Sequence, residues 1–285
     1  MSNLKGQIKK ELGTKWRHRV ALFFLAVGLA LCSLMGCTVE PGKVGGQAVE
    51  PVRQLRVLTY NIHHGEAMDG KFDYERLAQV ILDLHPDVVA LQEVDRGTLR
   101  ASGVDQAKLL GELTGMQAVF GPAMPYQGGQ YGEAVLSRFE MGKVEVWPLP
   151  FRPGQEPRAA LAVVIRPANG LPEFMLVGTH LCHQSNETRL EQTQQINRVL
   201  PAGGERPVIL AGDLNARPGS EPMQELLTER WVDVIAPQSR IDYVLIRPND
   251  PWRVVEVAIV DEQVVSDHRP VLAVLEWMDK AKKGS

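Results

Sequence analysis

Short apolar runs rich in β-branched residues recur along this chain, and a polar residue able to do chemistry stands at the end of most of them. Runs of this length and composition are typical of buried β-strands. A strand held in a core is rigid, so the residue at its end has a defined position at the rim of the fold. One such residue alone is usually a turn or structural residue. The set found here predicts a hydrolytic site built from several strand ends: Asn61, Glu93, His180, Asp213, Asn215, Asp242, Asp267 and His268.

The spacing of apolar residues predicts a mixed α and β fold. Helices are expected at residues 73–84, 106–113 and 187–200, where apolar side chains recur at helical spacing. Many strands and few helices favour two packed sheets with helices outside them. No linker-like segment interrupts residues 55–277, so we predict one domain there. The expected strands are 55–62, 87–94, 134–137, 144–147, 159–165, 173–180, 208–211, 241–246, 254–259 and 271–275.

The composition excludes several classes of protein. With 44% hydrophobic and 23% charged residues, the chain is too apolar for intrinsic disorder. Its three cysteines are too few for a disulfide scaffold. Of these, only Cys182 lies in the predicted domain, and without a partner we expect it to be a buried bystander.

The N-terminus resembles an export signal. Several Lys and Arg residues precede an apolar run from Val20 to Gly36, which is the layout of a secretory signal. The run is shorter than the ~20 residues that a membrane-spanning helix needs. Because Leu34-Met35-Gly36-Cys37 resembles a bacterial lipobox, we predict a signal over residues 1–36 and lipidation of Cys37. An uncleaved anchor helix and simple secretion are the alternatives.

The predicted signal changes the charge of the remaining protein. The full chain has a net charge of −3, but residues 1–36 carry six Lys or Arg and one acid, so the rest carries −8. A chain of this charge has no general attraction for polyanions. We therefore predict an exported protein in the cell envelope, anchored to the membrane through Cys37, with a tether at residues 37–54 and a short tail at 278–285.

Six short motifs around the polar residues resemble the endonuclease/exonuclease/phosphatase superfamily, the DNase I-like proteins. They occur in the family's order across nearly the whole predicted domain. The resemblance implies a four-layer α/β-β/α sandwich of two mostly antiparallel sheets with outer helices, and a metal-dependent phosphoesterase. The motifs are TYN (59–61), LQEV (91–94), GTHL (178–181), GDLN (212–215), RIDY (240–243) and SDHRP (266–270).

The resemblance also implies a metal site. Glu93 is the expected primary ligand, Asn61 joins it or holds a metal-bound water, and Asp267 contributes to this site or to a second one. Oxygen ligands of this kind suit Mg²⁺, and Mn²⁺ is the alternative. Such a cation helps a nucleophile approach an anionic phosphoester.

The catalytic roles implied by the resemblance centre on two histidines. His268 is the expected general base, oriented by Asp242, with Asp213 as a competing candidate for the base. Asn215 is expected to position Asp213 or the nucleophile and to donate a hydrogen bond to a phosphoryl oxygen. His180 is expected to donate to a non-bridging oxygen or to assist the leaving group. No carboxylate that would orient His180 is identifiable in the sequence.

Further residues near these motifs are weaker candidates for substrate contacts: Tyr131, Arg96, His63 and His64. The substrate class stays open between nucleic acid, phospholipid and a small phosphorylated molecule. A non-catalytic lipoprotein that uses the same fold as a binding module is the alternative to an enzyme. We predict no protein partner and a monomer.

Overall fold

The computed structural model describes residues 53–168, 170–200, 204, 206–228, 230–238 and 240–278. The predicted signal over residues 1–36, Cys37, and most of the tether and tail lie outside the described residues. Within this described part, no helix is long and apolar enough to cross a membrane.

The first sheet has six strands in the order β11-β12-β1-β2-β4-β3. Only β1 and β2 run parallel, and their neighbours pair antiparallel. The side chains of β1 and β2 are almost entirely buried, as their apolar sequences predict. The strands are β1 (Gln54–Asn61), β2 (Val88–Arg96), β3 (Gln117–Tyr126), β4 (Gly129–Ser137), β11 (Trp252–Ile259) and β12 (Val271–Trp277).

The second sheet repeats this arrangement in the order β5-β6-β7-β8-β10-β9. Here β7 and β8 form the parallel pair, and the other neighbours are antiparallel. The strands are β5 (Glu140–Pro148), β6 (Ala159–Arg166), β7 (Phe174–His180), β8 (Val208–Asp213), β9 (Val232–Asp233) and β10 (Asp242–Ile246).

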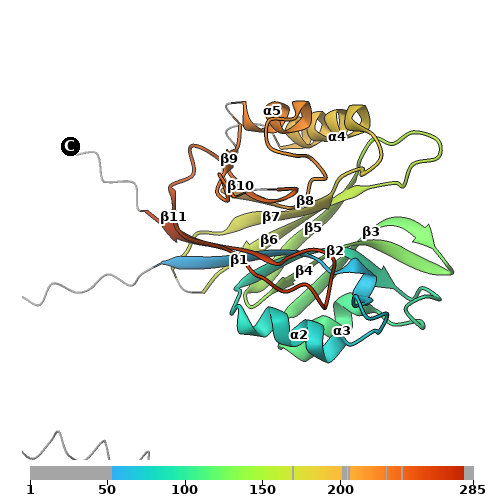
Figure 1. Cartoon of the computed structure of the whole chain (residues 1–285). Coiled ribbons are helices and arrows are strands. Elements are labelled where there is room, and N and C mark those ends of the chain that lie inside the picture. The colour runs from blue at the N-terminus through green and yellow to red at the C-terminus, as the bar shows by residue number, and fades with distance from the viewer. Residues whose placement is uncertain are drawn as a thin grey trace, which may run out of the picture. The chain divides into compact units, whose positions relative to one another are not determined.

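Four layers result, with the two sheets face to face and helices on both outer faces (Figure 1). Apolar side chains from both sheets, including Val57 and Ile209, form the central core. Helices α2 and α3 bury apolar side chains against the first sheet, and α4 and α5 do so against the second. The predicted four-layer sandwich is therefore confirmed. The helices are α2 (Tyr74–Asp83), α3 (Gln106–Thr114), α4 (Asn186–Val199) and α5 (Glu221–Leu227), with a short 3₁₀ turn η1 (His63–Gly65).

The three predicted helices begin at side-chain caps. Asp73 accepts a hydrogen bond from the backbone N–H of Arg76 at the start of α2, and Asp105 and Ser185 cap α3 and α4 in the same way. Such caps satisfy backbone N–H groups that have no partner within the helix. Beyond the prediction, the structure adds β3, β9 and α5.

The two parallel pairs place the site. Neighbouring parallel strands end at the same edge of a sheet, so β1 and β2 bring Asn61 and Glu93 together. In the second sheet β7 and β8 do the same for His180 and Asp213, which are register partners. Because the sheets face each other, the two pairs meet at one end of the sandwich.

Candidate active site

A hydrogen bond between the sheets joins the two parallel pairs. Asn61 Nδ2 lies 3.0 Å from Glu93 Oε1 in its own sheet and 3.3 Å from Asp213 Oδ2 in the other. Its Oδ1 accepts a hydrogen bond from the backbone N–H of His63. Asn61 is almost fully buried, so this amide has a fixed orientation. Side chains from the TYN, LQEV and GDLN motifs therefore lie in contact with one another.

Glu93 occupies an irregular position in β2. The pairing of β2 with β4 shifts between Leu91 and Val94, and Glu93 itself has a left-handed φ of 60°. Such a bulge re-aims a side chain out of the alternating pattern of a strand. Burial alone would raise the pKa of the Glu93 carboxyl. Contacts with His64 and Asn61 and the charge of Arg158 outweigh burial and hold this pKa well below its usual range.

Asp213 is a nearly buried carboxylate at the centre of the site. Its Oδ1 accepts a hydrogen bond from the backbone N–H of Asn215. Its Oδ2 lies 3.3 Å from His180 Nε2 and 3.5 Å from His268 Nε2. Burial raises the pKa of Asp213 to about 7, and the negative charge of Asp242 adds to this rise. A carboxyl with such a pKa can exchange a proton near neutral pH.

His268 is held from the other side of its ring. Asp242, the register partner of Asp213 in β10, accepts a hydrogen bond from His268 Nδ1 through oxygens that each lie 3.1 Å away. The Ser266 hydroxyl accepts from the backbone N–H of His268 and donates to the carbonyl of Asn61. Burial lowers the pKa of His268, but Asp242, with the charge of Asp213, outweighs it and raises this pKa to about 9.

The second histidine contacts an arginine that the sequence analysis missed. Arg158, directly before β6, is 3% exposed, and its Nη1 lies 3.1 Å from His180 Nδ1 and 3.2 Å from the Tyr131 hydroxyl. On the other ring nitrogen, Asn215 Nδ2 lies 2.9 Å from His180 Nε2. Burial and the charge of Arg158 lower the pKa of His180 well below its usual value, so this imidazole is neutral.

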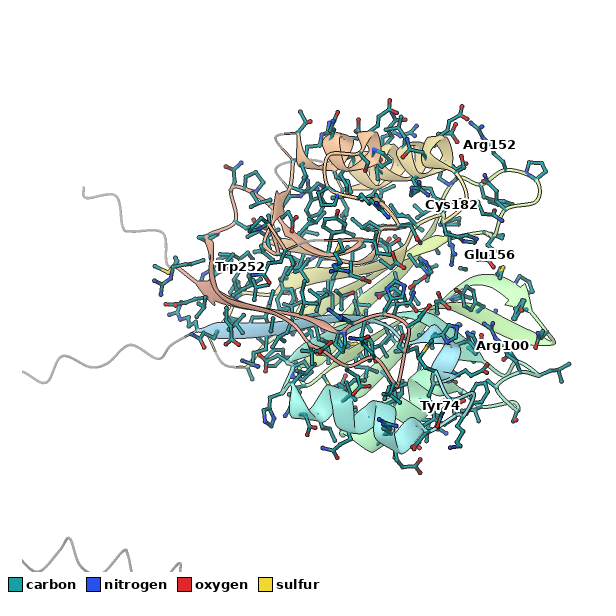
Figure 2. The ribbon with its side chains drawn as sticks, viewed as in Figure 1. Tyr74, Arg100, Arg152, Glu156, Cys182 and Trp252 are labelled. Atoms are coloured by element: carbon teal, nitrogen blue, oxygen red, sulfur yellow. The ribbon has the colours of Figure 1, made fainter. Side chains whose placement is uncertain are left out.

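A cavity of about 350 Å³ connects these side chains to the surface. Figure 2 shows Arg100 and Glu156 at the same end of the molecule, on loops of the two different sheets, and both line the cavity. Asp267, which is exposed, also lines it. The predicted substrate residues that line it are Tyr131, His63 and His64.

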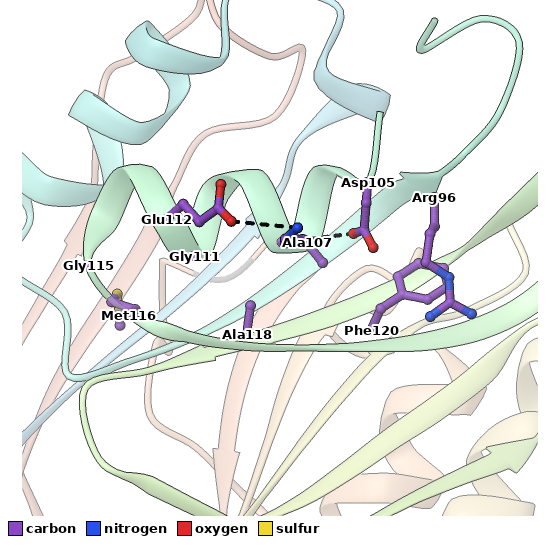
Figure 3. A pocket seen from close by; sticks show the side chains of 10 residues that line it. Arg96, Asp105, Ala107, Gly111, Glu112, Gly115, Met116, Ala118 and Phe120 are labelled. Atoms are coloured by element: carbon purple, nitrogen blue, oxygen red, sulfur yellow. Dashed lines mark hydrogen bonds and ion pairs between the residues drawn. The ribbon is translucent and has the colours of Figure 1, made fainter. Parts of the chain in front are cut away.

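Arg96 does not lie in this cavity. It lines a separate pocket beside α3, where its side chain lies over Phe120 and near Asp105 (Figure 3). Arg100, four residues later, lines the active-site cavity instead, above the rings of Tyr126 and Tyr131. Cys182 is buried and free, as expected of a bystander.

The donor atoms of the site suit a hard divalent cation. Glu93, Asn61 and Asp267 are the predicted residues whose oxygen atoms could hold such an ion, because Mg²⁺ prefers oxygen ligands. A second group, formed by Asp213, Asp242 and His268, has potential ligand atoms within 4.8 Å of one another. Hydrogen bonds already link Asp242 to His268 within this group.

Comparisons with known proteins agree with the fold. Residues 58–268 match the model of the Endonuclease/Exonuclease/phosphatase family. The structure of an endonuclease/exonuclease/phosphatase from Beutenbergia cavernae is 29% identical, with a TM-score of 0.66 over 79% of this chain and 72% of that one. A mannosyl-6-phosphatase from Bacteroides thetaiotaomicron is 19% identical, with a TM-score of 0.64 over 78% and 99%. The human Nocturnin catalytic domain, with bound sulfate, is 19% identical, with a TM-score of 0.62 over 79% and 95%.

Proposed function

Because the chain belongs to the endonuclease/exonuclease/phosphatase family, we propose that it is a divalent-metal-dependent phosphoesterase. The observation that carries this proposal is the bond network joining Glu93, Asn61, Asp213 and His268 across the two sheets. The buried carboxylate of Asp213 between two histidines favours a catalytic protein over one that only binds a ligand. In this network the negatively charged Glu93, which can bind a cation, lies next to Asp213, which can accept a proton.

Glu93, Asn61 and Asp267 would hold the cation, with Mg²⁺ as the expected ion. When bound, it supplies positive charge that neutralises the phosphoester and stabilises charge developing in the transition state. Asn61 would orient Glu93 and Asp213 at the same time, because its one amide nitrogen contacts both. This shared contact couples the metal site to the proton acceptor.

In the proposed reaction, a water oxygen forms a bond to phosphorus while the ester P–O bond breaks. Asp213 takes the proton of the attacking water, since its Oδ2 is the acceptor at the centre of the site. The leaving oxygen keeps the electron pair of the broken bond and takes a proton from solvent water. Asp242 favours the charged imidazolium of His268, which donates to a phosphoryl oxygen together with His180 and Asn215.

The walls of the cavity favour a small phosphorylated substrate. Its volume is at the low end of the roughly 300–1,000 Å³ found for small-molecule sites. Both of its arginines already have acidic partners, Arg100 with Asp95 and Arg158 with Glu156. A groove that binds a nucleic-acid backbone needs surplus positive charge. One structural neighbour is named a mannosyl-6-phosphatase, and a hexose phosphate would be a substrate of this compact kind.

A phospholipid head group is the second candidate, and a specific observation favours it. The side chains of Leu99 and Phe151 are 78% and 54% exposed. Each lies on a loop that also contributes to the cavity, through Arg100 and Glu156. If the two side chains form one apolar patch beside the site, that patch would be a surface for membrane contact.

We also propose that the protein is exported and anchored through a lipid on Cys37. The basic segment, the apolar run and the Leu34-Met35-Gly36-Cys37 sequence support this location. Membrane fractionation of cells expressing the full chain tests it. Cys37→Ser should move the protein out of the membrane fraction, whereas Cys182→Ser should not; retention of Cys37→Ser in the membrane would instead indicate an uncleaved anchor.

Hydrolysis of p-nitrophenyl phosphate and bis(p-nitrophenyl) phosphate by the detergent-solubilised full chain tests the activity. We expect hydrolysis with Mg²⁺ and none with EDTA. Asp213→Asn should lower kcat by about 1,000-fold, in the range of general-base and electrostatic effects. Asp83→Asn, the same change on the exposed face of α2, should be silent. Metal-independent hydrolysis or a fully active Asp213→Asn protein would contradict the proposal.

The substrate class is tested by comparing kcat/KM on a hexose phosphate, single-stranded DNA and phospholipid vesicles. The small-substrate proposal expects the hexose phosphate to be hydrolysed best. A preference for vesicles that is lost in Leu99→Ser and Phe151→Ser would establish the lipid head group instead. A preference for DNA would overturn both.

A further inference from the structure

Arg158 has an unusual position for an arginine, because it is buried and its contacts include two imidazoles. Its Nη1 lies 3.1 Å from His180 Nδ1, and its Nη2 lies 3.3 Å from His183 Nδ1. A contact of 2.8 Å with Glu156 Oε2 and one of 3.2 Å with the Tyr131 hydroxyl hold the guanidinium in place. The arginine is therefore oriented toward His180 by one group from β4 and one from the loop before β6.

The chemistry of the guanidinium decides where the proton of His180 resides. A guanidinium has five N–H donors, accepts no hydrogen bond and stays charged at any relevant pH. His180 Nδ1 must therefore accept from Arg158, and a neutral imidazole that accepts at Nδ1 has its proton at Nε2. With the other tautomer, a ring N–H would face a charged N–H inside a buried contact, which is unfavourable.

The two neighbours of His180 Nε2 favour different tautomers. Asp213 Oδ2, 3.3 Å from Nε2, is an acceptor for a proton at Nε2. The Asn215 amide nitrogen lies 2.9 Å from Nε2 and is a donor, so this contact favours the other tautomer; its second N–H donates to the carbonyl of Leu181 at 3.0 Å. The contact of His180 Nδ1 with charged Arg158 outweighs the contact of Nε2 with the neutral Asn215 amide, because charge-assisted hydrogen bonds are the stronger ones.

We propose that Arg158 is a positioning residue that holds His180 as the neutral tautomer with its proton on Nε2, so that His180 donates a hydrogen bond to a phosphoryl oxygen and transfers no proton. The role toward phosphate rests on the proposed phosphoesterase function, whereas the tautomer does not. Arg158 thus takes the place of the orienting carboxylate that the sequence analysis did not find. A carboxylate on Nδ1 would do the reverse, since it would accept from Nδ1 and favour a charged ring.

The tautomer is measurable without any catalysis. In the Mg²⁺-saturated full chain labelled with ¹⁵N-histidine, long-range ¹H–¹⁵N correlations distinguish a protonated ring nitrogen from an accepting one. The signals of His180 are identified by their loss in His180→Gln. We expect Nδ1 to be the accepting nitrogen and Nε2 the protonated one. Protonation of Nδ1 in the unmodified protein would overturn the inference, whether or not the protein is an enzyme.

Three variants of residues near His180 test the role of Arg158 in setting the tautomer. Arg158→Lys keeps a donor-only cation and should keep the tautomer, while Arg158→Met should give signals averaged over both tautomers. Tyr131→Phe removes a different partner of Arg158 and should leave the His180 signals unchanged. Unchanged signals from His183 and His268 in Arg158→Met would show that the fold persists. A single Nε2–H tautomer in that variant would overturn the role of Arg158.

The kinetic consequence is a separate readout on p-nitrophenyl phosphate. Arg158→Met should lower kcat by about 100-fold, the effect of one misaligned oxyanion donor, with a much smaller change in KM. Arg158→Lys should recover most of this loss. Combining Arg158→Met with His180→Gln should cost no more than His180→Gln alone, because both act through one hydrogen bond. Additive losses would contradict action through His180.

Discussion

Both carboxylate oxygens of Asp242 lie 3.1 Å from Nδ1 of His268, and the other ring nitrogen of His268 faces Asp213. The ring is therefore held between two acids from neighbouring strands. This favours the imidazolium form and places its proton beside the carboxylate that we assign as proton acceptor. The arrangement has a direct consequence for the pH dependence of the protein.

We predict a bell-shaped dependence of kcat/KM on pH. Activity should rise as Asp213 loses its proton near pH 7, where its pKa lies, and fall as His268 loses its proton near pH 9. Asp242→Asn removes the charge that raises both pKa values, so both limbs should move to lower pH. If the pH profile of Asp242→Asn is the same as that of the unmodified protein, groups other than Asp213 and His268 control the pH dependence.

Stability should follow the same titration of His268. Its pKa is raised in the folded protein, so the stabilisation is complete below the unfolded value of ~6.5 and is lost as pH rises through about 9. The thermal midpoint should therefore decline across this range, and the decline should be weaker in His268→Gln. An equal decline in both proteins would contradict this assignment.

Glu93→Gln should weaken metal binding specifically. The carboxylate is kept ionised by its neighbours, and the isosteric amide removes its charge while retaining its shape. We expect the Mg²⁺ concentration for half-maximal activity to rise by more than ~10- to 100-fold, the range for residues that only support a metal ligand. Mg²⁺ binding by calorimetry measures this independently. Glu112→Gln is the control, because Glu112 is an exposed carboxylate of α3 that pairs with Lys108 and does not line the active-site cavity.

The ion pair between Asp95 and Arg100 should be important for the stability of the fold. Asp95 is fully buried, and it accepts two hydrogen bonds from Arg100, of 2.6 and 3.0 Å, and one from Thr98. Arg100→Met leaves a buried charge without its partner, which costs about 3–5 kcal/mol. Arg152→Met breaks an exposed pair with Glu187 and Glu191, so it should leave the unfolding midpoint in urea unchanged. Equal midpoints for the two variants would contradict a structural role for Asp95.

The strand ends were predictable from the sequence because apolar runs and their polar ends are local signals. The runs before Asn61, His180 and Asp213 predicted buried strands, and these residues do meet at one end of the sandwich. By contrast, β3 was not predicted, since Gly121 and Pro122 interrupt its apolar pattern. Tertiary pairing with β4 overrides that local signal.

The positions of the arginines at the site could not be predicted from the local sequence. Arg96 and Arg100 lie four residues apart, and only the path of the loop after β2 decides which of them reaches the cavity. Arg158 precedes an ordinary apolar strand, so nothing in its neighbours along the chain indicates contact with His180. The left-handed backbone of Glu93 is likewise set by the bulge between β2 and β4.

The closeness of β7 and β8 depends on Gly212, directly before Asp213. A Cβ at this position would lie 1.9 Å from the backbone oxygen of Thr179, which cannot move without shifting β7. Gly212→Ala should therefore separate His180 from Asp213, lower the thermal midpoint and reduce kcat/KM by at least 100-fold, since both residues contribute to the transition state. Gly178→Ala, on β7 itself, is the matched control, because its Cβ would meet Ala90 at an ordinary 3.4 Å. A Gly212→Ala protein as stable and active as Gly178→Ala would show that this close approach does not position the site.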